Sequence, residues 1–204
     1  MFQLNKKEAR LIILQRIELI SNFLKRVRKF FGRYFFSNFI SKYFLSTKNV
    51  GKVYFEDMHQ EFESINSVIN PHNKNLLSIG GGLGGLELVI NKKFSVKSFT
   101  FIERNYVSKK VKYGWDNKNN EAYNDISIQK NFLIKNGMES TRFTIFDYDN
   151  DQLPKDKFDI IISLFSLDYH YDFKIYLDYL KSITHRHSKI IFDTIRPDYF
   201  KNIF

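Results

Sequence analysis

The sequence contains no cysteine and only three prolines among 204 residues, and it has no long apolar run. Without cysteine there can be no disulfide, no thiolate zinc site and no cysteine nucleophile, and the lack fits a reducing compartment. A membrane-spanning helix needs about 20 apolar residues in a row, whereas LIILQRIELI (11–20) is broken by Arg16 and Glu18. No small-residue cleavage site of a signal peptide follows it. We therefore expect a cytoplasmic protein without a metal site.

Acidic residues are scarce in the first quarter of the chain. Residues 1–52 contain 12 lysines and arginines but only two glutamates, so this segment carries the whole formal charge of +10. Residues 53–204 are balanced between the two signs. We interpret the change in charge as a boundary between a basic N-terminal extension (1–52) and a neutral domain (53–204).

The N-terminal extension has the pattern of an amphipathic helix. Six apolar residues repeat at spacings of four and three, as on one face of a helix: Ile13, Ile17, Ile20, Leu24, Val27 and Phe31. Basic residues, among them Lys25 and Arg26, lie on the opposite face. Gly32 is predicted to interrupt this helix, and the aromatic segment RYFFSNFISKYFL (33–45) follows.

Two interpretations of this extension remain open at the level of sequence. It can pack on the domain or on a second copy of the chain, which would make a homo-oligomer. Alternatively, residues 10–45 lie on the surface of an anionic membrane, with phenylalanines inserted and lysines and arginines around them. Binding to nucleic acid is the weakest of the alternatives.

The remainder of the chain alternates apolar strands with helices. A further helical stripe runs from Phe55 to Ile69. Strands are predicted at 76–80, 98–103, 142–147, 158–165 and 189–195, and helices at 83–93, 119–137 and 172–184. Alternation of this kind requires crossover connections and a parallel sheet covered on both faces. The expected fold is a doubly wound, Rossmann-like α/β domain with a sheet of about five strands.

Glycine is concentrated at one place. The chain has nine glycines, and five of them fall within GGGLGG (80–85), between the first predicted strand and its helix. A turn without side chains at this position lets a ligand approach the backbone at the carboxyl end of the sheet. The spacing satisfies both G-x-G-x-x-G, which is typical of dinucleotide sites, and G-x-G-x-G.

The order of motifs resembles class I S-adenosylmethionine-dependent methyltransferases over residues 74–196. LLSIGGGLGG is similar to their first motif, and FDIIISLFSLDYHY to their fourth. The resemblance implies S-adenosyl-L-methionine as cofactor, with Glu103 holding the ribose hydroxyls and Asp147 close to the adenine. It further implies cofactor contacts from residues in the first and fourth motifs: Ser78, Gly80, Gly81, Gly82, Gly84 and Leu164.

The sequence departs from this family in two respects. Ser78 stands where the first motif usually has an acid. The chain also ends about ten residues after the fifth strand, so the last two strands usual in the family are expected to be missing. Residues 1–70 or a partner would then cover the edge of the sheet, because an uncovered edge invites aggregation.

The segment SLFSLDYHYDF (163–173) is expected to face the transferred methyl group. A hydroxyl acceptor needs a base to take its proton, and His170, followed by Asp168, is the candidate. The segment lacks the proline-containing motif of enzymes that methylate base or glutamine amines. Together with the insertion at 109–137 it is similar to small bacterial methyltransferases assigned to sugars, and Tyr113, Trp115 and Tyr123 are candidates for an aromatic lid.

We expect O-methylation of a small molecule or of a sugar or glycan hydroxyl. Three alternatives remain: an NAD-dependent oxidoreductase, which the glycine spacing and Glu103 also fit; an RNA methyltransferase, given the basic N-terminus; and a catalytically inactive cofactor-binding module, given Ser78 and the early end of the chain.

Overall fold

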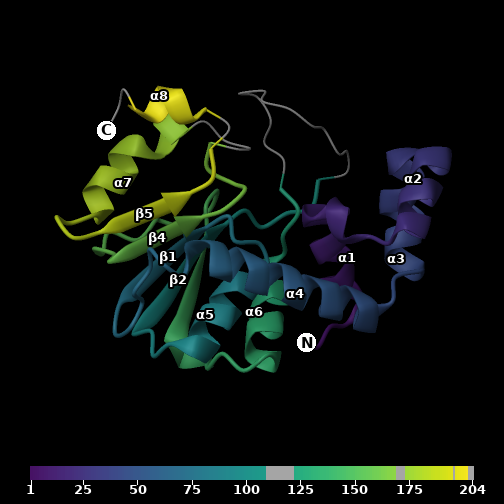
Figure 1. Ribbon diagram of the computed structural model, residues 1–204, viewed down its shortest axis with the longest axis horizontal. Helices are drawn as coiled ribbons and strands as arrows, with labels where there is room; N and C mark the ends of the chain where they lie inside the picture. Colours follow the sequence, from purple (N-terminus) through teal and green to yellow (C-terminus); the bar gives the residue numbers. More distant parts are fainter. Residues whose placement is uncertain (109–121, 169–172, 195, 202–204) are drawn as a thin grey trace.

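The computed structural model describes residues 1–108, 122–168, 173–194 and 196–201 (Figure 1). Five strands form one sheet in the order β3-β2-β1-β4-β5, and every neighbouring pair is parallel. The strands are β1 (Asn75–Ile79), β2 (Ser98–Glu103), β3 (Phe143–Asp147), β4 (Ile160–Ser163) and β5 (Lys189–Phe192). The predicted doubly wound fold is confirmed.

Alternate residues of the central strands are buried on opposite faces of the sheet. Leu76 and Phe101 contribute to a core shared with α4 (Thr47–Ile65), α5 (Gly85–Lys93) and α6 (Ile126–Lys135). Leu77 and Ile102 contribute to a second core, on the other face. The elements of that face are the 3₁₀-helix η4 (Phe173–Tyr176), α7 (Leu177–Ile183) and α8 (Pro197–Lys201), of which α8 was not predicted.

The N-terminal helices differ from the single amphipathic helix that the apolar stripe predicts. Three short elements take its place: α1 (Lys6–Gln15), the 3₁₀-helix η1 (Ile17–Leu19) and α2 (Asn22–Phe35). The helix ends at Arg16, with φ −132° and ψ 72°, and the guanidinium of this residue binds Asp57 (3.0 Å) and Glu61 on α4. The predicted interruption at Gly32 is confirmed by its non-helical φ of 79°. A π-helix η2 (Phe36–Ile40) and α3 (Ser41–Tyr43) follow.

Helix α1 belongs to the main core of the domain. Phe2 and Ile12 are buried in the same cluster as Tyr54 and Phe132. Helix α4 runs without interruption through residue 52, where the charge distribution changes. The division into 1–52 and 53–204 therefore stays a prediction that rests on the distribution of charge. Its boundary falls inside α4 and not between two helices.

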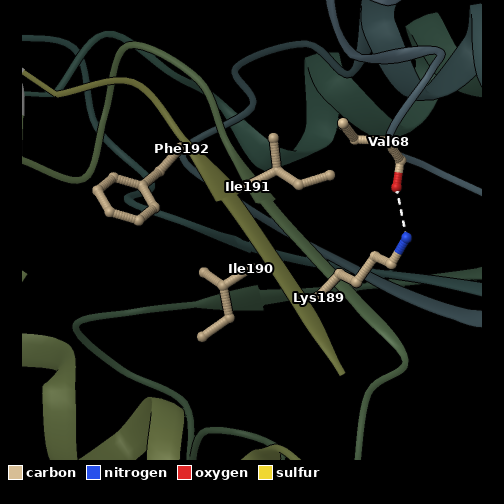
Figure 2. A pocket seen from close by; sticks show the side chains of 5 residues that line it. All are labelled: Val68, Lys189, Ile190, Ile191 and Phe192. Atoms are coloured by element: carbon tan, nitrogen blue, oxygen red, sulfur yellow. Dashed lines mark hydrogen bonds between the residues drawn. The ribbon is translucent and has the colours of Figure 1, made fainter. Parts of the chain in front are cut away.

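Strand β5 forms one edge of the sheet. In the described residues no further strand pairs with it. The Val68 carbonyl, from the N-terminal part of the chain, accepts a hydrogen bond from Lys189 Nζ at this edge (2.8 Å; Figure 2). Within the same described ranges, no helix is both long and apolar enough to cross a bilayer.

Candidate functional site

The glycine-rich turn lies at the carboxyl end of β1, beside the point where the strand order reverses between β1 and β4. Crevices at this position are where open α/β sheets bind their ligands. Gly80 and Gly82 have φ angles of 67° and 65°, a conformation that residues with a Cβ rarely adopt. Glycine is therefore required at these two positions by the backbone conformation of the turn.

Two polar side chains from distant segments lie directly against this turn. A Cβ added at Gly80 would lie 2.1 Å from Ser166 Oγ, in the loop that follows β4. A Cβ at Gly82 would lie 2.6 Å from Gln15 Oε1, at the end of α1. Gln15 Nε2 also donates a hydrogen bond to the Tyr123 carbonyl (2.8 Å), so α1 and the segment before α6 meet above the turn.

Gly85 serves packing. Its N–H donates a hydrogen bond to the Tyr54 hydroxyl (3.2 Å), and a Cβ at Gly85 would lie 2.5 Å from the same oxygen. The start of α5 is thereby held against α4, and one of the free amides at its N-terminus already has a partner.

Glu103 ends β2 beside the turn and carries an unusual carboxyl group. The side chain is buried, and Oε1 has no hydrogen-bond partner in the described part of the chain. Burial, reinforced by the nearby Glu87, raises its pKa well above the ordinary value; Asn124 and the backbone N–H groups of Gly81 and Gly82 oppose this by smaller amounts. The carboxyl group therefore points at the turn and lacks a partner for one oxygen.

A second buried carboxyl group lies beneath the turn. A Cβ at Gly81 would lie 2.3 Å from Ser78 Oγ and 3.2 Å from Glu87 Oε1. Burial raises the pKa of Glu87 to about 7, although the Ser78 hydroxyl hydrogen-bonds to the carboxyl group and lowers it. Glu87 Oε2 has no partner among the described residues. An acidic side chain from α5 thus lies next to the serine that occupies the acid position of the first motif.

Asp147 ends β3 directly beside Glu103, its partner in the register of the two strands. Its carboxylate oxygens accept hydrogen bonds from the Asp149 N–H (3.1 Å) and from Asn150 Nδ2 (2.7 Å). The side chain therefore stabilises the turn after β3.

The loop after β4 folds over the end of β1. The Ser163 hydroxyl donates to the Ile79 carbonyl (2.8 Å) and accepts from the Leu167 N–H (3.1 Å), and Leu164 is half-buried. Asp168 is fully buried, and its two carboxylate oxygens accept hydrogen bonds from the Thr194 hydroxyl and the Arg196 guanidinium. As a base, Asp168 would first have to leave this ion pair.

Three residues singled out by sequence lie outside the described residues: His170, Tyr113 and Trp115. Tyr123 is described, and its backbone carbonyl takes part in the wall above Gly82. In the parts of the chain that are described, no group of three or more histidine and acidic residues is arranged to hold a metal ion.

Sequence reasoning missed Gln15, Asn124 and Glu87. Asn124 Nδ2 donates hydrogen bonds to the Gly82 carbonyl (3.2 Å) and to Gln129 Oε1 (3.0 Å). Only Glu87 left a signal, since it is a lone acid within an apolar helical run. The contact between Gln15 and a turn more than 60 residues away leaves no signal in the sequence.

A hollow at β5 is lined by Val68, Lys189, Ile190, Ile191 and Phe192 (Figure 2). Lys189 is its only charged side chain, and that ammonium group is already bound to a carbonyl. This hollow contains none of the candidate site residues.

No protein-family model matches the chain, and no curated protein matches it. Among solved structures it is similar to a Methanococcus maripaludis protein assigned as an S-adenosyl-L-methionine-dependent methyltransferase, with a TM-score of 0.51 and 15% identity over 71% of this chain and 59% of that one. A Geobacter sulfurreducens methyltransferase in complex with S-adenosyl-L-homocysteine has a TM-score of 0.44 and 13% identity over 67% of this chain and 47% of that one. The chain therefore spans about half the length of these structures. The first of these likenesses shows that the chain shares the doubly wound α/β fold of that protein.

Proposed function

We propose that the protein is an S-adenosylmethionine-dependent methyltransferase. The observation that carries this proposal is the Glu103 carboxyl group, which is buried beside the glycine turn with one oxygen unpaired. A buried polar atom without a partner is costly in a folded protein. A pair of ribose hydroxyls is a suitable partner, because each can donate a hydrogen bond to the carboxylate.

The charges around the turn favour this cofactor over NAD. The carboxyl groups of Glu87 and Glu103 both lie against the turn, where a dinucleotide would place its pyrophosphate. Burial raises the pKa of both carboxyl groups, and a nearby pyrophosphate would raise these pKa values further, whereas the sulfonium and ammonium groups of S-adenosylmethionine would lower them and favour the ionised carboxylates. The hydrogen bond from the Gly85 N–H to Tyr54 also disfavours NAD. Amides at a helix N-terminus commonly bind phosphate, and this amide is already used.

The residues of the site divide into distinct roles. Glu103 would hold the ribose, and the backbone of Gly80–Gly82 would lie against the cofactor, which supplies an electrophilic methyl group. Glu87, bound to Ser78, would provide the negative charge that the first motif usually carries at the position of Ser78. Asp147 would limit the adenine pocket from the turn after β3, and Leu164 would supply an apolar wall.

The acceptor that we propose is a hydroxyl of a small molecule, sugar or glycan. Methyl transfer to a hydroxyl requires removal of its proton and in-line placement of donor and acceptor. His170 is the proposed base, because both oxygens of Asp168 are bound to Thr194 and Arg196. Asp168 would then hold the loop in position. A His170→Ala variant should bind cofactor normally and lose turnover.

Titration of the protein with S-adenosylmethionine, S-adenosylhomocysteine and NAD, followed by calorimetry and thermal unfolding, tests the proposal. The first two ligands should bind and raise the melting temperature by mass action, and NAD should not. Glu103→Gln should weaken S-adenosylhomocysteine binding at least tenfold, because hydrogen bonds to a charged group contribute roughly 1.5–3 kcal/mol. Glu139→Gln, which changes an exposed carboxyl group, is the matched control. Binding of NAD alone would refute the assignment, and binding without turnover on any hydroxyl acceptor would favour an inactive cofactor-binding module.

The proposed enzyme works in the cytoplasm, which the lack of cysteine fits. An RNA acceptor is less well supported, because the basic charge is concentrated in residues 1–52 and the domain that carries the turn is neutral. RNA binding through phosphates would weaken steeply with added salt. Retention of RNA at low salt and its loss at high salt would favour that alternative.

A further inference from the structure

Several aromatic side chains of α2 are exposed. Phe23, Phe30 and Phe31 are 73%, 83% and 55% exposed, whereas Leu24 on the predicted apolar stripe packs against the core. The exposed aromatic residues continue through η2 to the segment after α3, and we call this set the aromatic patch: Phe23, Phe30, Phe31, Phe35, Phe39, Tyr43 and Phe44. A run of seven exposed aromatic side chains is more than the scattered apolar residues of an ordinary surface.

The rings from Phe30 onward contact one another. Their centroids are 4.9 Å apart for Phe30 and Phe31, 5.1 Å for Phe35 and Phe39, and 5.7 Å for Phe39 and Phe44. Figure 1 shows α2 at the edge of the molecule, beside α3 and away from the sheet. The aromatic patch is therefore one continuous surface on a projecting element.

Basic side chains surround the aromatic patch. Lys25, Arg26 and Lys29 are exposed on the same helix, and Arg26 lies one turn from both Phe23 and Phe30. None of the three takes part in an ion pair within the described residues. An apolar face with aromatic residues, flanked by exposed lysines and arginines, is typical of helices that lie in the interface of an anionic membrane.

We propose that α2, η2 and α3 form a docking surface for an anionic lipid bilayer. The rings of the aromatic patch would enter the boundary between headgroups and acyl chains, and the basic side chains would contact lipid phosphates. A second copy of the chain fits less well, because residues 1–52 carry +10 and the rest of the chain is neutral. Two such surfaces would repel each other, and the remainder offers no acidic excess to attract one.

The docking surface is joined closely to the glycine turn. Helix α2 begins at Asn22, only seven residues after Gln15, whose side chain lies against Gly82. Docking of α2 would therefore tether the turn to the lipid surface through the short segment between Gln15 and Asn22. If the protein transfers methyl groups as proposed above, an acceptor held in the membrane, such as a lipid-linked glycan, would fit this arrangement. Only the choice of acceptor depends on the proposed function; the docking surface does not.

Sedimentation of the full-length protein with vesicles tests the docking surface directly and does not depend on any methyltransferase activity. The vesicles are phosphatidylcholine alone, or phosphatidylcholine with an equal part of phosphatidylglycerol. The wild type should sediment with the anionic vesicles and much less with the neutral ones. Phe30→Ser/Phe31→Ser should reduce anionic-vesicle binding at least tenfold, because two exposed rings are removed without touching the core. Ile175→Ser, an exposed apolar residue on η4, is the matched control and should bind as the wild type does.

Neutralising basic residues distinguishes binding to lipid phosphates from binding through apolar contacts alone. Lys25→Gln/Arg26→Gln/Lys29→Gln should lose at least tenfold in binding, since each basic residue near an anionic surface contributes roughly fivefold. An equal number of exposed lysines changed elsewhere should have little effect: Lys130→Gln/Lys155→Gln/Lys181→Gln.

Three outcomes would overturn the proposal. The first is a wild type that stays in the supernatant with anionic vesicles. The second is equal sedimentation of the wild type and the Phe30/Phe31 variant. The third is a concentration-dependent dimer, seen by analytical ultracentrifugation and abolished in the Phe30/Phe31 variant, without vesicle binding; it would assign the patch to a second copy. Point substitutions are preferred to deletion of residues 1–50, because Phe2 and Ile12 belong to the core.

Discussion

The buried carboxyl group of Glu87 makes the stability of the protein depend on pH in a way that can be measured. Burial raises its pKa from 4.5 to about 7 in the folded protein, so folding favours the protonated form. Stability from this group is therefore fully present below about pH 4.5 and is lost as the pH rises through 7. The difference in pKa corresponds to about 3 kcal/mol, at 1.36 kcal/mol for each pKa unit.

Replacement of Glu87 by glutamine removes the charge and keeps the shape. The variant should match the wild type at pH 4 and exceed its free energy of unfolding by about 3 kcal/mol at pH 8.5. The melting temperature should then rise by roughly 6–12 °C at the higher pH, since 1 kcal/mol shifts a domain of this size by about 2–4 °C. If Glu87 also attracts the cofactor, the stabilised variant should bind S-adenosylmethionine less tightly, a common trade between stability and function.

Urea unfolding of both proteins at half-unit intervals from pH 4 to 8.5 is the assay. The pKa of Glu103 is itself raised by Glu87, so the difference between the two curves at each pH reports the Glu87 carboxyl group together with its interaction with Glu103. Glu139→Gln, an exposed control, should stay within about 0.5 kcal/mol of the wild type throughout. A difference between Glu87→Gln and wild type that does not change with pH would refute the reasoning.

Two further predictions concern the contacts that hold the N-terminal helices to the domain. Tyr54→Phe removes the hydrogen bond to the Gly85 N–H and should lower the free energy of unfolding by about 1 kcal/mol, measured by urea unfolding; an unchanged midpoint would mean that packing alone fixes α5. Lys135→Met leaves the fully buried Glu8 without its cation (Nζ–Oε1 2.7 Å) and should destabilise by about 2 kcal/mol, less than the 3–5 kcal/mol of a fully buried pair because the lysine is partly exposed. Thermal unfolding of the Lys135 variant checks this, and a melting temperature equal to that of the wild type would contradict it.

The sheet could be predicted from sequence because its strands are short apolar runs between polar turns. SFTFIE (98–103) matches β2 residue for residue, and β1 begins one residue before its prediction. The strand predicted at 158–165 is longer than β4 at both ends, because its flanking apolar residues Phe158 and Leu164 pack in the loops. The helix predicted at 119–137 begins at Ile126 in the described residues, where Asp125 caps it.

The parts that sequence could not predict depend on contacts between distant residues. The end of α1 lies at Arg16, which binds Asp57 and Glu61, more than 40 positions away, and helical periodicity carries no information about such partners. The same holds for Gln15 on the glycine turn. Glu103 was found by its position at a strand end, but its unpaired oxygen follows only from the packing around it.

The pairing of α1 with α6 has a consequence for synthesis of the chain. Glu8 bonds to Lys135, and the Gln3 N–H donates to Asn136 Oδ1 (2.8 Å), so the first helix meets its partners on α6 only after about 130 further residues have been made. At about 5–20 residues per second, a ribosome needs on the order of ten seconds for that length. During this interval the apolar side of α1 and the neighbouring aromatic segment emerge together without a fold to receive them. A nascent chain of this kind is exposed to chaperones and lipid before its own core exists.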